Sequence, residues 1–553
     1  MANTLLDLFE KNHQLLEWRD KVTLLSRQLV MGFSGSSKAV VMASALSEQV
    51  PKILIVTSTQ NEAEQLTGDL SAILGEDKVY SFFADDVVAA EFIFASPEKT
   101  HSRLESLNFL MDKEASGVLV TSLVGTKLHL PNPKVYKDSR INLALGEEHD
   151  LEALSKHLTH IGYQRVEQVL SPGEFSRRGD ILDIYELTAE LPYRLEFFGD
   201  EIDGIRQFDS DSQKSLDNLE HIIVSPADDI ILTREDYQRA EKALESAVSK
   251  AEGPHKAYLE EVLSVTIDGY RHKDLRKFLS LFYDKAYTLF DYLPKGTPVF
   301  IDDFQKIVDR HGRLELEVAN LLTEDLHQGK SLSHLNYLVD SFKTLRNYQP
   351  ASFFSNFHKG LGNLKFDKLY QFTQYPMQEF FNQFPLLVDE IHRYTKNKAT
   401  VILQVGSEKQ LKSLKETLEE YDLDLPLSSF GNLIPHKPQL VLGNLSNGFY
   451  FADEKLVLVT EREIFHKKVK RRARASHVSN AERLKDYNEL EKGDYVVHQT
   501  HGIGQFKGIE TIEIKGVHRD YLTIQYQDAA TISLPIEQIE SLSKYVSADG
   551  KEP

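Results

Sequence analysis

The chain has 553 residues, of which 41% are hydrophobic and 27% are charged; it contains no cysteine and has a formal net charge of −20. This length predicts several domains, and the composition is that of a soluble globular protein with no apolar run long enough to span a membrane. The lack of cysteine excludes disulfides, thiolate catalysis and thiolate zinc sites, and the negative charge favours protein partners over a broad nucleic-acid surface.

The N-terminal segment Met1–Leu16 has the pattern of an amphipathic helix and carries acidic residues. A secretory signal peptide begins instead with basic residues, which an apolar segment follows. We therefore expect a cytoplasmic protein.

A degraded phosphate-binding loop follows. A working loop reads G-x-x-x-x-G-K-[ST]; its last glycine lets the backbone wrap the phosphates, and its hydroxyl binds Mg²⁺. Here Ser37 replaces that glycine and Ala39 has no hydroxyl, so only Lys38 keeps its type. The motif positions are Gly32, Gly35, Ser37, Lys38 and Ala39. We interpret the segment as an ATPase loop that has lost its chemistry; the alternative is an accidental Ser/Gly-rich turn.

The segment around this loop has the pattern of an α/β domain. Strands are predicted at Lys52–Val56 and Gly117–Thr121, both fully apolar, with an amphipathic helix at Gln60–Leu74 between them. Continuous apolar strands that alternate with helices indicate a parallel sheet covered on both faces.

Between about Leu130 and Leu216 the pattern changes to antiparallel strands, which predicts a separate, inserted domain. Strands are expected at Asp180–Tyr185, Tyr193–Phe198 and Glu201–Ile205. Five arginines of the segment lie among aromatic residues, a composition found both at solvated surfaces and at protein interfaces. These arginines are Arg165, Arg177, Arg178, Arg194 and Arg206. Strand alternation places Arg178 and Tyr185 on opposite faces unless Gly179 forms a bulge.

A second degraded ATPase motif lies further along the chain. After a helix expected at Thr233–Lys250, the apolar strand Thr297–Asp302 ends in acid, where helicases have Asp-Glu-x-His. Asp302 is kept, but Asp303 and Gln305 replace the glutamate and the histidine. We expect the first sheet to resume here, although an ordinary buried strand is the alternative.

Residues 350–460 have a further α/β pattern without recognisable chemistry. Asp389–His392 does fit Asp-Glu-x-His, but Phe384, Leu387 and Ile391 recur at helical spacing. Because the helicase motif must end a β-strand, we predict that Asp389–His392 is a solvated helix face.

A basic run and a β-rich unit end the chain. Residues 467–474 contain six cations, which fit a solvated linker or a nucleic-acid contact. Ser479–Glu482 has the form of a capping box before a short helix. From Gly493, short glycine-separated strands predict a small barrel, in which Ile509–Ile514 alternates as an edge strand able to pair with another protein, or as a strand facing the core.

At this point the sequence resembles two known groups of proteins. Ser171–Tyr185, Arg194–Ile202 and Leu289–Pro294 resemble the nucleotide-excision-repair protein UvrB, and Gly493–Gly504 resembles the RNA-polymerase-interacting domain of bacterial transcription-repair coupling factors, the Mfd family. Only that family joins the two modules in this order, and the resemblance covers essentially the whole chain.

The resemblance implies the N-terminal half of such a factor, an adaptor that binds stalled RNA polymerase and recruits UvrA. It implies that Arg165, Arg178 and Tyr185 bind UvrA. It also implies that the polymerase β subunit binds the strand residues Glu510, Thr511, Ile512 and Glu513. It implies no catalytic residue, metal or cofactor here, since ATP and Mg²⁺ would serve a translocase half outside this chain, which would also make most contacts with DNA.

The fold class that follows is a degenerate P-loop, helicase-like α/β domain with an inserted α+β domain, a further α/β domain and a small C-terminal β-barrel of the Tudor/CarD type. The expected boundaries are UvrB-like domain 1a at 1–127, inserted UvrB-like domain 2 at 128–214, UvrB-like domain 1b at 215–348, a family-variable α/β domain at 349–462, a basic linker and helix at 463–491, the polymerase-interacting barrel at 492–548 and a tail at 549–553.

Two alternatives stay open. The first is an active helicase or ATPase of the UvrB type, which DNA-stimulated ATP hydrolysis would reveal. The second is a DNA-binding module that uses the basic run at residues 467–474, which steeply salt-dependent duplex binding would reveal.

Overall fold

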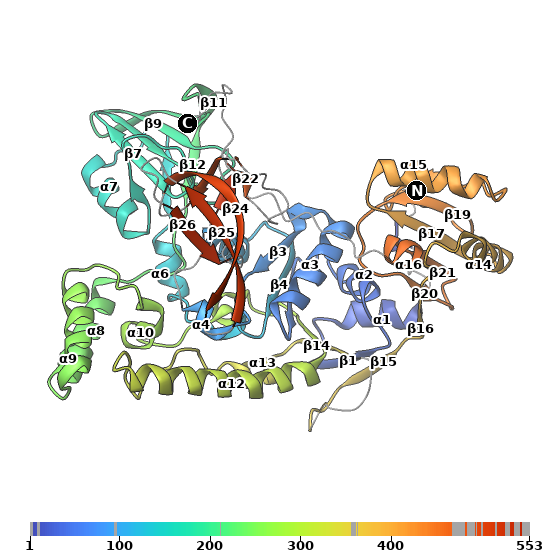
Figure 1. Cartoon of the computed structure of the whole chain (residues 1–553), viewed down its shortest axis with the longest axis horizontal. Helices are drawn as coiled ribbons and strands as arrows, with labels where there is room; N and C mark the ends of the chain where they lie inside the picture. The colour runs from blue at the N-terminus through green and yellow to red at the C-terminus, as the bar shows by residue number, and fades with distance from the viewer. Residues whose placement is uncertain are drawn as a thin grey trace.

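Figure 1 shows the arrangement of the chain in a computed structural model. The structure describes residues 4–7, 12–92, 97–210, 212–355, 361, 363–466, 482–483, 493, 495–498, 502–514, 517–525, 531–535 and 542–544. Several sheets, one of them parallel throughout, are flanked by helices, which confirms the predicted mixed α/β architecture. The basic run at 467–474 and the tail at 549–553 lie outside the described residues.

A seven-stranded parallel sheet, the first sheet, lies at the centre of the molecule (Figure 1). Its order is β15–β1–β14–β13–β2–β4–β3, and each neighbouring pair is parallel. Strands β2, β4 and β13 are buried along their whole length, as their continuous apolar sequences predicted. The bounds are β1 Arg27–Met31, β2 Lys52–Thr57, β3 Val79–Phe82, β4 Gly117–Ser122, β13 Val299–Asp302, β14 Ala351–Ser355 and β15 Lys368–Gln371.

Side-chain caps mark the start of three helices that lie around the first sheet, α1, α3 and α6. Helix α3 spans Gln60–Leu74, the predicted range, and the Thr59 side chain caps it by accepting from the Glu62 amide. The N-terminal prediction was wrong in part, since Thr4–Asp7 forms a turn and α1 starts only at His13. The bounds are α1 His13–Lys21, α2 Ser36–Ser44, α4 Val88–Glu91, α5 Pro97–Met111, α6 Pro133–Asp138 and the 3₁₀ helices η2 Glu76–Lys78 and η3 Gly125–Lys127.

The inserted domain has a six-stranded sheet in the order β11–β10–β9–β8–β7–β6, antiparallel except for β6 with β7. A separate ribbon of β5 and β12 joins it to the rest of the chain. The bounds are β5 Ile141–Ala144, α7 Leu151–His160, β6 Gln164–Arg165, β7 Glu174–Arg178, β8 Ile181–Ile184, β9 Tyr193–Phe198, β10 Glu201–Phe208, β11 Ser215–Leu219 and β12 His221–Val224.

Helices connect the inserted domain back to the first sheet. The prediction that this sheet resumes at Asp302 is confirmed, because β13 pairs with β2 and β14. The 24-residue helix α12 follows directly and runs along the base of the molecule (Figure 1). The bounds are α8 Arg234–Val248, α9 Gly253–Ile267, α10 Leu275–Phe282, α11 Leu289–Tyr292, α12 Phe304–His327 and α13 Phe342–Asn347.

The second α/β domain, from β16 to α16, is here called the third unit. Its sheet has the strand order β16–β20–β21–β17–β19–β18. The predicted boundary after residue 348 was wrong for the next two strands, because β14 and β15 pair into the first sheet as far as Gln371. The bounds are β16 Gln374–Pro376, α14 Phe384–Lys396, β17 Thr400–Val405, α15 Glu408–Glu419, β18 Leu427–Ser428, β19 Pro438–Leu442, β20 Phe449–Phe451, β21 Leu456–Val459 and α16 Glu461–Phe465.

The C-terminal strands pair in the order β22–β27–β23–β24–β25–β26, all antiparallel. Closure of this sheet into a Tudor/CarD-like barrel stays a prediction. The capping box was wrong at Glu482, which lies in a strand; the helix expected after it lies outside the described residues. The bounds are β22 Glu482–Arg483, β23 Tyr495–His498, β24 Gly502–Ile514, β25 Val517–Gln525, β26 Thr531–Pro535 and β27 Leu542–Lys544.

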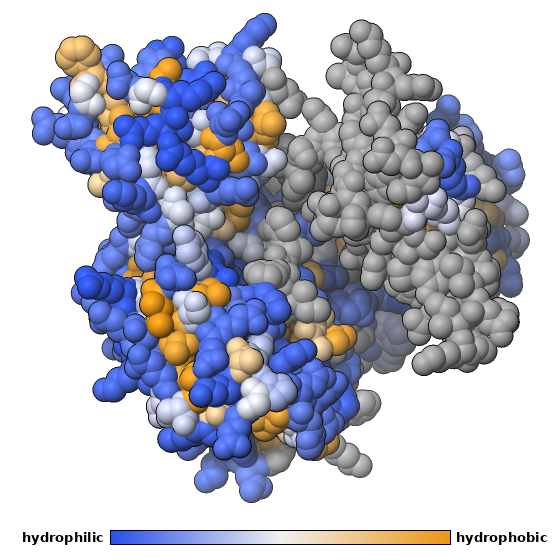
Figure 2. Space-filling model, turned by 60° about the vertical axis from the view of Figure 1, so that its left-hand side comes forward, coloured by the Kyte–Doolittle hydropathy of each residue, from blue (hydrophilic) through white to orange (hydrophobic). Residues whose placement is uncertain are grey.

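Hydrophilic side chains dominate the face that carries the inserted domain and the helices below it, and the apolar side chains there form small groups (Figure 2). This surface agrees with a composition in which 27% of the residues are charged. In the part of the chain that the structure describes, none of the helices combines the length and the apolar character that a membrane crossing requires.

A buried ionic cluster holds the end of the inserted domain against the first sheet's helices. Asp229 accepts hydrogen bonds from Arg103 on α5 at 2.9 Å and from Arg276 on α10 at 2.6 Å. Burial alone would raise the pKa of Asp229, but Arg276 and Arg103 outweigh it and keep that pKa below its ordinary value. The cluster therefore depends on a carboxylate that stays ionised.

We predict that Asp229→Ala destabilises the chain by about 3–5 kcal/mol, because it leaves two buried guanidiniums without their counter-charge. Urea unfolding of the variant measures this loss. Asp217→Ala, on the exposed strand β11, is the matched control and changes the free energy of unfolding by less than about 0.5 kcal/mol. An equal loss in both variants would contradict the assigned role of Asp229.

Candidate functional site

The degraded phosphate loop lies where a working one would, between β1 and the N-terminus of α2. Gly32 and Gly35 both have positive φ values, +96° and +57°, which the turn out of the strand requires. Ser36 begins the helix and Ala39 lies on its first turn with no exposed surface. The backbone path of the motif is thus kept although its chemistry is not.

Lys38 is paired with the other motif remnant. Its Nζ lies 2.5 Å from Oδ1 of Asp302, at the end of β13, and the two side chains are 19% and 11% exposed. In a working site these residue types would contact phosphate and Mg²⁺. Here they neutralise each other.

The two substituted positions take structural roles. The Ser37 hydroxyl donates to the Ser34 carbonyl at 2.7 Å, so it stabilises the loop itself. Ala39 packs in the core below the sheet and offers no oxygen to a metal. Asp303, in place of the motif glutamate, has a φ of +54° and starts α12. The arrangement has neither the flexible glycine nor the hydroxyl that Mg·ATP chemistry needs.

The second match to the helicase pattern is a helix face, as predicted. Asp389–His392 lies within α14, whose buried residues Leu387 and Ile391 face the core. Asp389 and His392 are exposed on the other side. These carboxylates therefore do not end a strand.

The inserted-domain sheet places Arg178 and Tyr185 on the same face. The predicted need for a bulge was wrong, because the chain reverses in a two-residue turn at Gly179–Asp180 and the register pairs Arg178 with Ile181. Cross-strand partners share a face, and Tyr185 lies four residues beyond Ile181. The sequence-based prediction treated Arg178 and Tyr185 as parts of one continuous strand. Because the chain turns between them, it assigned the two side chains to opposite faces.

Asp183, which the sequence did not single out, organises that face. It lies in β8, its side chain is 1% exposed, and it accepts from Arg178 at 2.9 Å and from Arg194 at 2.7 Å and 2.9 Å. These hydrogen bonds raise the pKa of Arg194, whose guanidinium also lies over the Phe208 ring. The alternation of Asp183 with apolar neighbours was the signal that could have identified it.

The three predicted contact residues differ in exposure. The Arg178 side chain is 52% exposed, and Arg165 is exposed on the edge strand β6. The register pairs Arg165 with the buried Phe175, which places it on the opposite face from Arg178. Tyr185 is only 6% exposed, packs with Val169 and Phe208, and donates its hydroxyl to the Glu190 carbonyl at 3.0 Å. Tyr185 thus supports the face from below.

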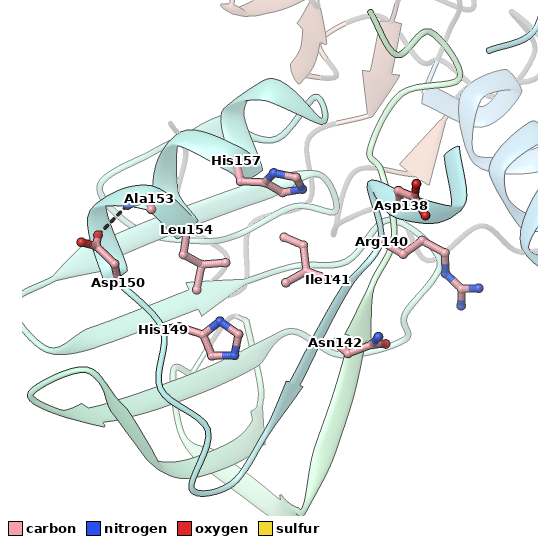
Figure 3. Close-up of a pocket in the computed structure, with 9 residues that line it drawn as sticks. All are labelled: Asp138, Arg140, Ile141, Asn142, His149, Asp150, Ala153, Leu154 and His157. Carbon is pink, nitrogen blue, oxygen red and sulfur yellow. Dashed lines mark hydrogen bonds between the residues drawn. The ribbon is translucent and has the colours of Figure 1, made fainter. Parts of the chain in front are cut away.

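A hollow of about 430 Å³ lies on the other side of this domain, beside α7 (Figure 3). His149 and His157 lie on either side of Leu154 and Ile141, and the Arg140 guanidinium points away from them. His157 already contacts the Ser139 carbonyl at 3.2 Å. Among the described residues no group of three or more histidines and acids could hold a metal ion.

The predicted polymerase-binding residues Glu510, Thr511, Ile512 and Glu513 lie in the second half of β24. This strand is longer than expected, because Gly502, Gly504 and Gly508 lie inside it and the only register irregularity falls between Phe506 and Gly508. Strand β23 pairs with residues 502–505 of β24, and the Gly493 amide donates to the Phe506 carbonyl at 2.8 Å on the same side. Within the described residues, β24 beyond Phe506 therefore pairs only with β25 and keeps one open edge.

Three family models match separate parts of the chain. They are the UvrB interaction domain at residues 141–229, the MFD, D3 domain at 394–464 and the CarD-like/TRCF RID domain at 490–546. The first covers the inserted sheet and its ribbon, the second most of the third unit, and the last the C-terminal strands.

Curated relatives match across these domains. The chain is 34% identical over 541 residues to a transcription-repair-coupling factor of Bacillus subtilis (strain 168), with 96% of this chain and 46% of that protein covered. Those of Staphylococcus epidermidis (strain ATCC 12228 / FDA PCI 1200) and Staphylococcus aureus (strain MRSA252) are 30% and 29% identical, each with 95% of this chain and 46% of the relative covered. The chain spans about half the length of these relatives. Over nearly its whole length, therefore, the chain corresponds to the N-terminal portion of the transcription-repair-coupling factors.

Proposed function

We propose that this chain is a binding scaffold of transcription-coupled nucleotide excision repair, which contacts RNA polymerase through its C-terminal sheet and recruits UvrA through its inserted domain. The observation that carries the proposal is the union in one chain of a UvrB interaction domain and a CarD-like/TRCF RID domain. The relatives' name, transcription-repair-coupling factor, supports the same role.

The scaffold hydrolyses no ATP in this proposal. The ion pair of Lys38 with Asp302 and the loss of the motif hydroxyl at Ala39 support this part. ATP-driven movement on DNA, with its Mg²⁺, would lie in the part of the relatives that this chain does not cover. DNA-stimulated ATP turnover by this chain would instead establish a UvrB-like ATPase. Salt-dependent binding of duplex DNA by this chain would establish a DNA-binding module.

The UvrA surface is proposed to lie on the Arg178 face and to extend around the β6 edge to Arg165. Both side chains are exposed arginines of the kind enriched at interface hot spots, and Asp183 holds Arg178 in place. The matching surface for RNA polymerase is the open edge of β24, to which a strand of the β subunit would add by main-chain hydrogen bonds.

We predict that Arg178→Glu or Arg165→Ala weakens binding to purified UvrA by about tenfold or more, which corresponds to about 1.4 kcal/mol, and leaves polymerase binding unchanged. Pull-down and titration with both partners measure the two affinities. Arg313→Glu, an exposed change on α12, is the matched control and leaves both unchanged. Wild-type UvrA affinity in both test variants would remove the assigned surface.

Tyr185 should behave as a support and not as a contact. We predict that Tyr185→Phe keeps UvrA affinity while it lowers stability by about 1 kcal/mol, because it removes only the hydroxyl bond to Glu190. Thermal unfolding and the UvrA titration are run on the same sample. A weakened affinity with unchanged stability would instead make the hydroxyl part of the interface.

For the polymerase surface, we predict that Ile512→Arg weakens binding to the β subunit by about tenfold and leaves UvrA binding intact. Titration against the purified β subunit measures the change. Thr531→Arg on β26, at the far edge of the same sheet, is the control and retains affinity. If Thr531→Arg and Ile512→Arg weaken binding equally, the open edge of β24 is not the specific contact.

A further inference from the structure

Two segments outside the first sheet cover the degraded phosphate loop. These closing segments are Phe372–Gln374, which runs from the end of β15 to the first residue of β16, and Ser446–Gly448, between β19 and β20. A Cβ on Gly32 would lie 2.0 Å from the Phe372 carbonyl oxygen, and one on Gly35 would lie 3.1 Å from Cβ of Asn447. The backbone of the loop is therefore in direct contact with both segments.

The first closing segment forms a hydrogen bond with a backbone amide of the loop, a group that in a working motif would donate to a phosphate. Oε1 of Gln374 accepts from the Ser34 amide at 3.0 Å and lies 2.5 Å from the Ser37 hydroxyl oxygen, whose proton the Ser34 carbonyl accepts. Loop amides of this kind are the groups with which a working motif holds phosphate oxygens. A neutral amide oxygen takes that position here.

The second closing segment is held by a buried carboxylate. Asp69, on α3, accepts from the Ser36 hydroxyl at 2.9 Å and from the Ser446 amide and hydroxyl, both at 2.8 Å. The Asn447 amide donates in turn to the Ser36 hydroxyl at 2.9 Å. The Asp69 side chain thus lies beside the start of α2, at the position where a working motif would hold the phosphates of a nucleotide.

Apolar packing continues the contact around these polar groups. Phe33 lies 4.6 Å from Phe372 and 5.6 Å from Phe451, measured between ring centroids. One hydrophobic core joins α2 and the first sheet to the third unit, including Val441 and Leu445. Figure 1 shows the third unit beside α2 and β1.

We propose that the former nucleotide face is an intramolecular docking surface for the third unit. The closing segments fill it, fix the first sheet and the third unit as one rigid body, and exclude nucleotide from the loop. This exclusion acts in addition to the sequence changes at Ser37 and Ala39. Restoring the consensus residues at these two positions therefore does not restore nucleotide binding. The inference does not depend on either proposed partner.

An engineered disulfide tests the contact in solution. The Ser36 and Ser446 hydroxyl oxygens are 3.2 Å apart, and the chain has no native cysteine, so Ser36→Cys/Ser446→Cys creates one defined thiol pair. With diamide, we expect most of the protein to form the intrachain bond, seen as a mass loss of two hydrogens, at the same rate with and without Mg·ATP. Ser36→Cys/Ser413→Cys, with the second thiol on the exposed face of α15, stays reduced. A folded test pair that stays reduced, or that Mg·ATP protects, overturns the proposal.

Amide hydrogen exchange on Asp69→Asn tests the same contact without cysteines. Loss of the shared carboxylate should speed exchange by about tenfold or more at both Gly32–Lys38 and Leu445–Gly448. Asp389→Asn on α14 is the control and changes neither segment. Faster exchange in only one segment, or in neither, overturns the coupling.

Isothermal titration with Mg·ATP tests the exclusion. The variant Ser37→Gly/Ala39→Ser keeps the Ser34 amide bond to Gln374 and the Asp69 bonds to Ser446, and it should show no saturable binding. Saturable binding by this variant overturns the exclusion, whatever the chain does with UvrA or RNA polymerase.

Discussion

The hydrogen bonds of the Asp69 side chain are the interaction on which the contact between the first sheet and the third unit depends. It is 3% exposed and accepts hydrogen bonds from Ser36, at the start of α2, and from Ser446, in the loop between β19 and β20 of the third unit. Buried hydrogen bonds of this kind are stronger than exposed ones, because water does not compete for their donors and acceptors. Without an acceptor at this point, the Ser36 and Ser446 hydroxyls would be buried without their partner at the edge of a shared core.

That constraint explains why a degraded motif keeps its backbone shape. Gly32 must remain a glycine because the Phe372 carbonyl occupies the space of a side chain, and no phosphate is needed to explain it. In the same way, Lys38 and Asp302 keep their residue types because each neutralises the other in a partly buried position. The requirements of folding alone can therefore explain residues that resemble those of a former catalytic site.

The parts of the fold that sequence could predict are those governed by local pattern. The parallel strands follow from continuous apolar runs, and α3 follows from its periodicity and the Thr59 cap. The closing segments could not be predicted, because Ser446 and Asp69 are 377 residues apart and each looks like an ordinary polar residue. The face shared by Arg178 and Tyr185 was missed for another reason, since it depends on where the chain turns and not on residue type.

The paired ribbon of β5 and β12 has a consequence for how such chains can change. Ile141 lies directly opposite Val224, so the polypeptide enters and leaves the inserted domain at neighbouring points. An insertion with adjoining ends leaves the spacing of the host sheet unaffected, whatever its own size or sequence. The inserted domain is therefore a cassette that recombination can exchange or transplant as a whole, and a partner specificity can be acquired or replaced without redesigning the body that carries it.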